Sequence, residues 1–259
     1  MAGRAAETGS GWISAGPEAL VFRVRLDVAT PAPERVRVEG RALHHLRVAR
    51  VAPGEAVEVF DGRGRAWAAR VESLEEGAAV LRLGEERQGA PGRIVVLVQA
   101  LPKGDKLDWL MMKATELGVS EIWPVLTARS VSRPKPESLG GRQARWQRIA
   151  EEAARQSGRA DVPGIGALRS LEDAVAALPP GLRLLVLDEE ERSERLADAA
   201  GDEPVALVVG PEGGLTREEV QALASRGGRA VTLGPLILRT ETAGLAALAV
   251  LRHRDGLLG

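Results

Sequence analysis

The sequence contains no cysteine and only three histidines in 259 residues. The absence of cysteine excludes disulfides, thiolate metal sites and a thiol nucleophile. The histidines, His44, His45 and His253, are too few and too scattered to predict a metal site, and their spacing does not indicate a Ser-His triad. We therefore expect no metal cofactor.

Long apolar runs are also missing. No run approaches the roughly 20 residues that span a bilayer, and residues 1–19 carry Gly, Ser, Ala and Pro without the apolar core of a signal peptide. We expect a disordered leader at 1–19, no membrane association and a cytoplasmic protein. The 44% hydrophobic and 27% charged residues are typical of a globular chain of one large domain or two of ordinary size.

The net charge of −1 hides an asymmetry. Residues 129–159 hold eight Lys and Arg against three Asp and Glu, whereas residues 171–225 hold four against thirteen. A basic segment on an acidic protein is what binding to a phosphate backbone requires. The alternative is a bias of composition, because Arg outnumbers Lys by 31 to 4 and scatters over any surface.

The pattern of apolar residues changes near residue 90. Residues 20–88 contain short alternating runs such as "EAVEVFD" and "AWAARVES", separated by Gly turns and interrupted by one helix, "GRALHHLRVAR", which predicts a small β-barrel. From residue 89 to 259, apolar strands such as "RIVVLVQAL", "RLLVLD" and "PVALVVG" alternate with helices. That alternation predicts a second domain with a parallel sheet covered on both faces.

Ligands of open α/β sheets bind at the carboxyl ends of the strands, and three such ends fall in the last third of the chain. The clearest is "ALVVGPEGGLTREEV", in which Thr216 and Glu219 form a predicted capping box after a glycine loop. Glycines allow backbone amides to approach a ligand, so we expect a valine at Gly213 to block binding. Glu212 would repel phosphate, which favours a neutral or cationic ligand. The alternative is that this segment is an ordinary turn between a strand and a helix and binds no ligand.

The stretch "LGPLILRTETAGLAAL" (233–248) places Arg239, Thr240, Glu241 and Thr242 where a strand gives way to a buried helix. If a threonine only capped the helix, the two adjacent charges would have no purpose. In the basic segment, Trp146 suits base stacking or, more commonly, a core position. His44 and His45 suit either a helix surface or an RNA contact.

Six motifs then occur in the order found in one family. They are "HHLRVAR…G..VEVFDG", "PKGDKLDWLMMKATELGV", "ARSV", "QSGR…P", "VGPEGGLTREE" and "LGPLILRTETA". From about Val21 onward the chain resembles the RsmE family, bacterial 16S ribosomal RNA uridine N3-methyltransferases of the SPOUT superfamily. Two departures are Leu236, where many relatives carry a basic residue, and Arg155, where relatives often have Glu.

The resemblance implies a PUA-like RNA-binding β-barrel (20–88), then an α/β SPOUT methyltransferase domain (89–259) with a C-terminal deep trefoil knot. It implies S-adenosyl-L-methionine as cofactor, 16S rRNA or the small ribosomal subunit as partner, and a homodimer that packs beside the knot. It also implies methylation of N3 of a uridine in the decoding region. The helix "TAGLAALAVL" favours the dimer, because it is apolar almost all round and its small residues Ala243, Gly244, Ala246 and Ala247 allow close approach.

Site residues follow from the same resemblance and from the strand ends. The catalytic candidates are Arg239, to stabilise charge on the uracil, and Glu241, to accept a proton or orient the base. The expected cofactor-binding residues are Leu187, Gly210, Pro211, Glu212, Gly213, Gly214, Leu233, Gly234, Leu238, Thr240 and Thr242. The expected RNA-binding residues are Arg47, Lys103, Lys106, Arg129, Arg133, Arg145 and Arg159.

Two other classes of function remain open at this point. One is a non-catalytic RNA-binding module, which would fail to bind S-adenosylmethionine. The other is a nucleotide-dependent oxidoreductase, which the missing G-x-G-x-x-G motif disfavours.

Overall fold

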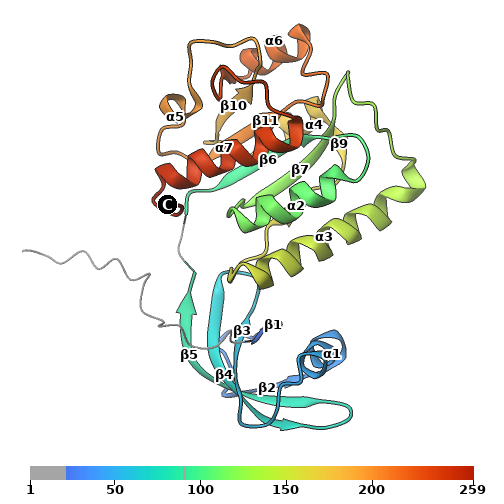
Figure 1. The fold of residues 1–259 in the computed structure, drawn as a ribbon, viewed down its shortest axis with the longest axis vertical. Coiled ribbons are helices and arrows are strands. Elements are labelled where there is room, and N and C mark those ends of the chain that lie inside the picture. Colours follow the sequence, from blue (N-terminus) through green and yellow to red (C-terminus); the bar gives the residue numbers. More distant parts are fainter. Residues whose placement is uncertain (1–21, 90–91) are drawn as a thin grey trace, which may run out of the picture.

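The computed structural model describes residues 22–89 and 92–259, and the expected leader at 1–19 lies outside them. Figure 1 shows two sheets stacked along the long axis, each with its own helices. The elements of the first part are β1 (Phe22–Arg25), β2 (Arg35–Val38), α1 (Gly40–Val48), β3 (Ala56–Phe60), β4 (Arg65–Leu74) and β5 (Ala79–Gln88).

The first sheet has the strand order β1-β3-β4-β5-β2. Its buried face follows the alternating pattern of the sequence, and Leu43 and Leu46 of α1 complete the core around Trp67. Strands β4 and β5 bend at two irregular points in their register. Within the described residues β1 and β2 do not pair, so the expected barrel is an open, curved sheet that α1 helps to cover.

The second sheet is parallel throughout and has the order β12-β10-β11-β6-β7-β8, with β9 also paired to β7. Its fully buried strands are the continuous apolar runs of the sequence. The whole sheet consists of β6 (Val95–Ala100), β7 (Glu121–Leu126), β8 (Gly164–Ile165), β9 (Arg169–Ser170), β10 (Arg183–Leu187), β11 (Val205–Val209) and β12 (Arg229–Val231).

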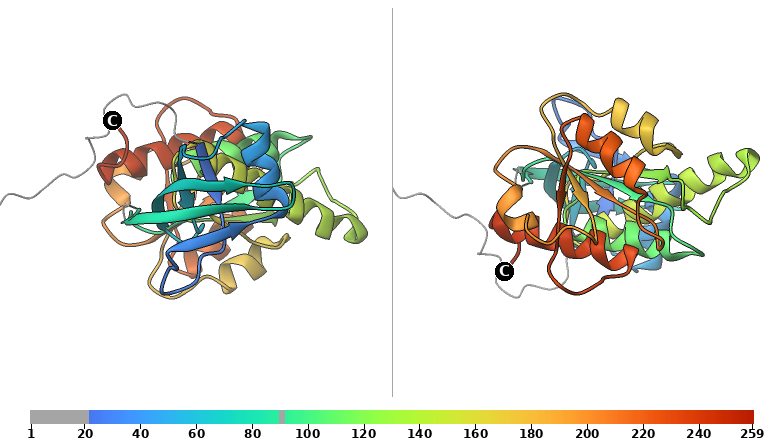
Figure 2. Two further views of the ribbon diagram at one scale, coloured as in Figure 1. Left: turned by 90° about the horizontal axis from the view of Figure 1, so that it is seen from below. Right: turned by 90° about the horizontal axis from the view of Figure 1, so that it is seen from above.

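Helices cover both faces of this sheet, as the alternation predicted (Figure 2). One face packs against α2 (Lys106–Glu116), α3 (Leu139–Gln156), α5 (Leu196–Ala199) and α7 (Thr240–Arg254), and the other against α4 (Leu171–Ala176) and α6 (Arg217–Ser225). A short 3₁₀ turn, η1 (Pro136–Ser138), precedes α3. The sequence did not predict α4, β8 or β9, which are too short to show a clear period.

The two parts are joined by more than the connecting chain. Arg23 of β1 donates to the carbonyl oxygens of Ala154, Arg155 and Arg159, at and just beyond the C-terminal end of α3. A bridge between Gly62 and Asp161 joins the loop after α3 to the first part. Helix ends leave carbonyls without partners, so an arginine at that point stabilises the end of α3.

Candidate active site

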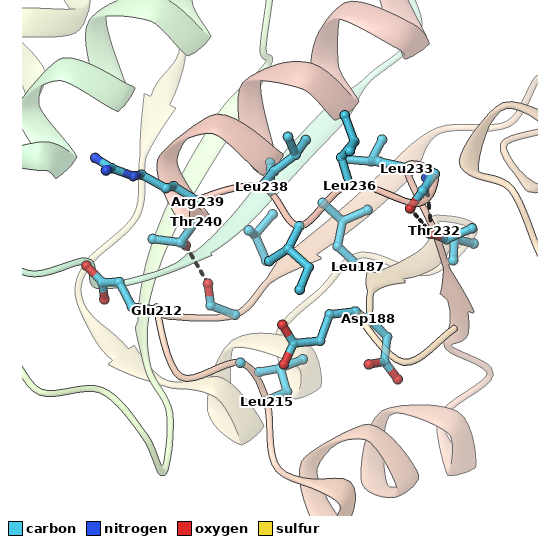
Figure 3. A pocket seen from close by; sticks show the side chains of 18 of the residues that line it. Leu187, Asp188, Glu212, Leu215, Thr232, Leu233, Leu236, Leu238, Arg239 and Thr240 are labelled. Atoms are coloured by element: carbon cyan, nitrogen blue, oxygen red, sulfur yellow. Dashed lines mark hydrogen bonds between the residues drawn. The ribbon is translucent and has the colours of Figure 1, made fainter. Parts of the chain in front are cut away.

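A cavity of about 290 Å³ opens at the carboxyl ends of β10, β11 and β12 (Figure 3). These ends lie together because Leu187 is in register with Val209 on one side and with Val231 on the other. The walls are mainly apolar, and residues of the 210–215 and 232–240 segments close the cavity above the sheet.

Most of the expected cofactor-binding residues line this cavity, and Arg239 stands at its edge. Those that line it are Leu187, Gly210, Pro211, Glu212, Gly214, Leu233, Gly234, Leu238 and Thr240. Gly213, Thr242 and Glu241 are not in the lining. Asp188, at one of the three expected strand ends, also lines the cavity, and three further charged residues of the lining were not expected from the sequence: Glu189, Arg192 and Arg217.

The glycine loop is held by its own backbone and by one arginine. The amide of Gly214 donates to the carbonyl of Pro211 at 2.9 Å, and Gly214 has φ +69°, which favours glycine. The predicted capping box is present: Thr216 and Glu219 bond each other's backbone at the start of α6. Arg129, expected to bind RNA, donates from Nη1 to the carbonyl of Gly213 at 2.7 Å and so supports the loop from outside.

The expectation about Gly213 needs correction. Its φ is not positive, and a Cβ atom there would lie 3.4 Å from the flexible side chain of Arg129. At Gly210, by contrast, a Cβ atom would lie 3.0 Å from the amide nitrogen of Leu215. The loop therefore requires glycine at Gly210, for space, and at Gly214, for its backbone angle.

Asp188 follows β10 and forms a two-pronged ion pair with Arg217 at the start of α6. Both nitrogen–oxygen distances are 2.8 Å, and the carboxylate is almost fully buried while the guanidinium is half exposed. The hydrogen bonds from Arg217 outweigh the effect of burial and lower the pKa of Asp188. The pair joins the end of β10 to the far side of the glycine loop.

Glu212 faces the beginning of α2. Its carboxylate accepts from the amide of Lys103 at 2.9 Å, and the ammonium of Lys106 lies 3.4 Å away. Burial raises the pKa of Glu212, but these hydrogen bonds outweigh it and lower the pKa. Because Lys106 partly neutralises the charge, Glu212 is a weaker reason to expect a cationic ligand than the sequence suggested.

Three charged residues, Arg239, Glu241 and Lys106, meet at the beginning of α7 and form what we call the charged corner. Arg239 is the N-cap residue and is exposed, whereas the side chain of Glu241 is 11% exposed. Lys106 lies 3.2 Å from the Glu241 carboxylate, so it joins the two acidic residues Glu212 and Glu241. The sequence assigned Lys106 to RNA binding and gave no sign that α2 reaches this corner.

Thr240 and Thr242 do not cap α7 with their side chains. The hydroxyl of Thr240 donates to the carbonyl of Gly210 at 2.5 Å and accepts from Nε2 of Gln99 at 3.0 Å. Thr242 is exposed. Gln99 was not among the expected site residues, although an amide in the apolar strand "VVLVQA" is a visible signal.

Several expected RNA contacts are engaged within the protein. Arg159 has a side chain only 12% exposed and donates to the carbonyls of Thr115 and Val119 at the end of α2. It holds the fold together and offers little surface to RNA. The other engaged residues are Arg145, paired with Asp108 at 2.5 Å, Arg133, which donates to the carbonyl of Thr127, and Arg47, which donates to the carbonyls of Glu75 and Glu76.

The structure also shows where Trp146 and the two histidines of α1 lie. Trp146 is buried in the core between α3 and the sheet and is not available to stack on a base. His44 is exposed, and His45 lies at a smaller cavity between α1 and α3. None of the described helices is long and apolar enough to cross a membrane.

Two family models match the chain. An RNA methyltransferase domain matches residues 90–252, and an RNA methyltransferase PUA domain matches residues 38–84. The chain is 31% identical to the ribosomal RNA small subunit methyltransferase E of Bacillus subtilis, over 85% of this chain and 91% of the relative. It is 36% identical to that of Mycobacterium tuberculosis, over 79% of this chain and 80% of the relative.

Solved structures agree. The methyltransferase E of Neisseria gonorrhoeae, bound to S-adenosyl methionine, is 34% identical with a TM-score of 0.82, over 90% of this chain and 97% of that one. A putative methyltransferase of Legionella pneumophila, in complex with the same cofactor, is 26% identical with a TM-score of 0.79, over 91% and 98%. The fold is that of RNA methyltransferases with a PUA-like domain, and the chain belongs to the ribosomal RNA small subunit methyltransferase E family.

Proposed function

We propose that this protein transfers a methyl group from S-adenosylmethionine to N3 of a uridine in 16S ribosomal RNA, in the decoding region of the small subunit. The observation that carries the proposal is the cavity at the ends of β10, β11 and β12, with a charged corner beside it, in a chain of this family. We place the protein in the cytoplasm, with its substrate.

The cavity fits the cofactor. Its apolar walls, among them Leu187, Leu233 and Leu238, suit a flat purine base, and backbone groups of the 210–214 and 233–238 segments are available to bind its polar edge. The absence of a side chain at Gly210, which lines the cavity, lets the loop fold back closely on Gly214 and Leu215. When bound, S-adenosylmethionine supplies the methyl group on a positively charged sulfur.

The protein must make uracil N3 a nucleophile, because that nitrogen carries a proton at neutral pH. Arg239 is exposed at the beginning of α7 and stabilises the negative charge that develops on the uracil carbonyl oxygens. Glu241 accepts the proton or orients the base, and Lys106, 3.2 Å away, holds its carboxylate in place. Bringing N3 in line with the methyl–sulfur bond adds the benefit of orientation.

RNA is held by both parts of the chain, which we divide into a domain at 20–88 and a domain at 89–259. The PUA-like part supplies one surface. The outer face of α3 supplies another, since Arg142 and Arg148 are exposed there. Lys103 and Arg129 lie near the cavity and suit phosphates on either side of the target base.

We also propose that the C-terminal segment is threaded as a deep trefoil knot. Three backbone hydrogen bonds support this. The amide of Asp188 donates to the carbonyl of Val231, while Thr232 exchanges bonds with the carbonyl of Glu194 and the amide of Leu196. Residues 231–232 are thus in contact with both ends of the 188–196 segment.

The active form is a homodimer that packs through the open face of α7. Gly244 and Ala247 are buried within the single chain, so they do not provide the close approach that the sequence suggested. Ala243, Ala246 and Val250 are only half-buried, and Leu236 is 78% exposed at the mouth of the cavity. Sedimentation equilibrium should give twice 27.4 kDa. A monomer with full activity would contradict the dimer.

The proposed function is tested in cells. Ribosomal RNA from cells that lack the gene should contain no 3-methyluridine at the target position, and a plasmid copy should restore it. An Arg226→Ala copy serves as the control, because Arg226 is exposed at the end of α6 and away from the cavity. An unchanged nucleoside profile in the deleted strain would reject the function.

A further inference from the structure

Strand β6 carries one amide side chain in an otherwise apolar run. Gln99 is fully buried between β11 and β7. Burying an amide destabilises a fold unless its hydrogen-bonding groups are matched. Within residues 22–89 and 92–259, Oε1 of Gln99 has no hydrogen-bond partner. An apolar residue would therefore suit this position better if packing alone mattered.

The orientation of the amide follows from its neighbours. Nε2 of Gln99 donates to the carbonyl of Ala100 and to the hydroxyl of Thr240, each at 3.0 Å. Turning the amide over would put two oxygen atoms in contact at Ala100. The oxygen atom of the amide, Oε1, faces Gly244. A Cβ atom at Gly244 would lie only 2.9 Å from Oε1, so the glycine leaves room for this oxygen.

This orientation fixes the direction of the next hydrogen bond. An amide nitrogen can only donate, so the Thr240 hydroxyl accepts from Gln99 and its single proton is directed to the carbonyl of Gly210, 2.5 Å away. Bonds arranged in this order strengthen one another. The chain of hydrogen bonds thus runs from β6 through the first residue of α7 to the beginning of the glycine loop.

We propose that Gln99 is a positioning residue for methyl transfer. Thr240 lies between Arg239 and Glu241, and Gly210 begins the loop that lines the cavity, so this chain sets the distance between the reacting corner and the cofactor loop. The inference rests on the proposed function, because only a reaction between those two segments requires their distance to be fixed.

Three variants test the kinetic consequence. Gln99→Met keeps the length of the side chain without the amide, Thr240→Val keeps the shape without the hydroxyl, and Thr240→Ser keeps the hydroxyl. We expect the first two to lower kcat by about 10- to 100-fold, because small misplacements at a reacting centre have large effects. In Gln99→Met, KM and Kd for S-adenosylmethionine should change by less than about threefold, because Gln99 does not line the cavity. Thr240→Ser should retain activity.

Matched controls remove the same groups elsewhere. Gln143→Met removes an amide that donates to the carbonyl of Ile165 at 3.3 Å, and Thr115→Val removes a buried hydroxyl bonded to the carbonyl of Met111 at 2.7 Å. Both should leave kcat unchanged. The double variant of Gln99→Met and Thr240→Val should be no slower than the slower single variant, because both break one chain. A double variant whose loss of kcat equals the product of the two single losses would overturn the proposal.

Hydrogen exchange supplies a readout that does not depend on methyl transfer. Amides of residues 210–215 and 240–244 should exchange faster in Gln99→Met and Thr240→Val, and at wild-type rates in Thr240→Ser and both controls. Unchanged exchange in either segment would overturn the proposal. If Gln99→Met does not fold, Thr240→Val decides, and wild-type kcat in that variant rejects the role of the chain. If the wild-type protein transfers no methyl group, the proposed function fails, while exchange still tests the hydrogen bonds.

Discussion

Gly210→Ala should disturb the cofactor loop while leaving the rest of the fold in place. The new Cβ atom would lie 3.0 Å from the amide nitrogen of Leu215 and 3.2 Å from the carbonyl carbon of Gly214. Comfortable contacts of this kind are about 3.5–4.0 Å, so the overlap is roughly half an ångström against two backbone atoms. Crowding of this size destabilises a protein by about 1–3 kcal/mol.

The same displacement should weaken the cofactor site. If the loop loses about 1.4 kcal/mol of binding energy, Kd for S-adenosylmethionine rises about tenfold, which isothermal calorimetry measures directly. Gly213→Ala is the matched control, because its Cβ atom would meet only the flexible Arg129 side chain, at 3.4 Å. Equal affinities for the two variants would show that contact with the loop backbone does not shape the site.

Three further perturbations test the corner, the RNA surface and the rim of the cavity. Arg239→Ala should lower kcat about 100-fold or more, while calorimetry shows little change in cofactor affinity, because the charge acts on the transition state; equal losses in both would contradict this role. Reversing the charges of Arg142 and Arg148 should weaken RNA binding and flatten its dependence on salt, since each phosphate contact releases counterions; an unchanged slope would point to composition alone. Asp188→Asn should reduce the free energy of unfolding by about 1 kcal/mol near neutral pH. Because Arg217 lowers the pKa of Asp188, the stabilisation is present above the unfolded pKa of 3.8 and lost as pH falls through the folded value. Urea titrations of both proteins should therefore converge in strong acid, and a constant difference would refute the assignment.

Local patterns in the sequence predicted much of the fold. Continuous apolar runs indicated β6, β10 and β11, and the spacing of Thr216 and Glu219 indicated the start of α6. Each of these signals depends on residues close together in the chain. The strand ends then located the cavity, because parallel strands bring their carboxyl ends to one edge.

Features that depend on residues far apart in the chain do not show in the sequence. Arg159 was expected to bind RNA because it is an arginine in the basic segment. Its side chain instead donates hydrogen bonds to carbonyls about 40 residues away, at the end of α2. Lys106 was assigned to RNA, and only the packing of α2 beside α7 brings it to Glu241. Gln99 meets Thr240 across 141 positions. No period or spacing within one element reports such meetings.

The glycine loop illustrates a finer limit. Its sequence indicates that the loop requires glycines, but it does not show at which positions the backbone angle or the lack of space excludes a side chain. Gly214 requires its positive φ and Gly210 its lack of a side chain, whereas Gly213 has ordinary geometry. These differences arise from how the loop folds back on Leu215, which the order of residues alone does not reveal.

The most direct test of the account is methyl transfer by the purified protein. Small ribosomal subunits from cells that lack the gene are incubated with the protein and isotopically labelled S-adenosylmethionine, and the nucleosides of 16S rRNA are separated by mass spectrometry. We expect one labelled product, 3-methyluridine, at a single position, and its loss with Arg239→Ala. Label on another nucleoside, or no transfer by a protein that binds the cofactor, would contradict it.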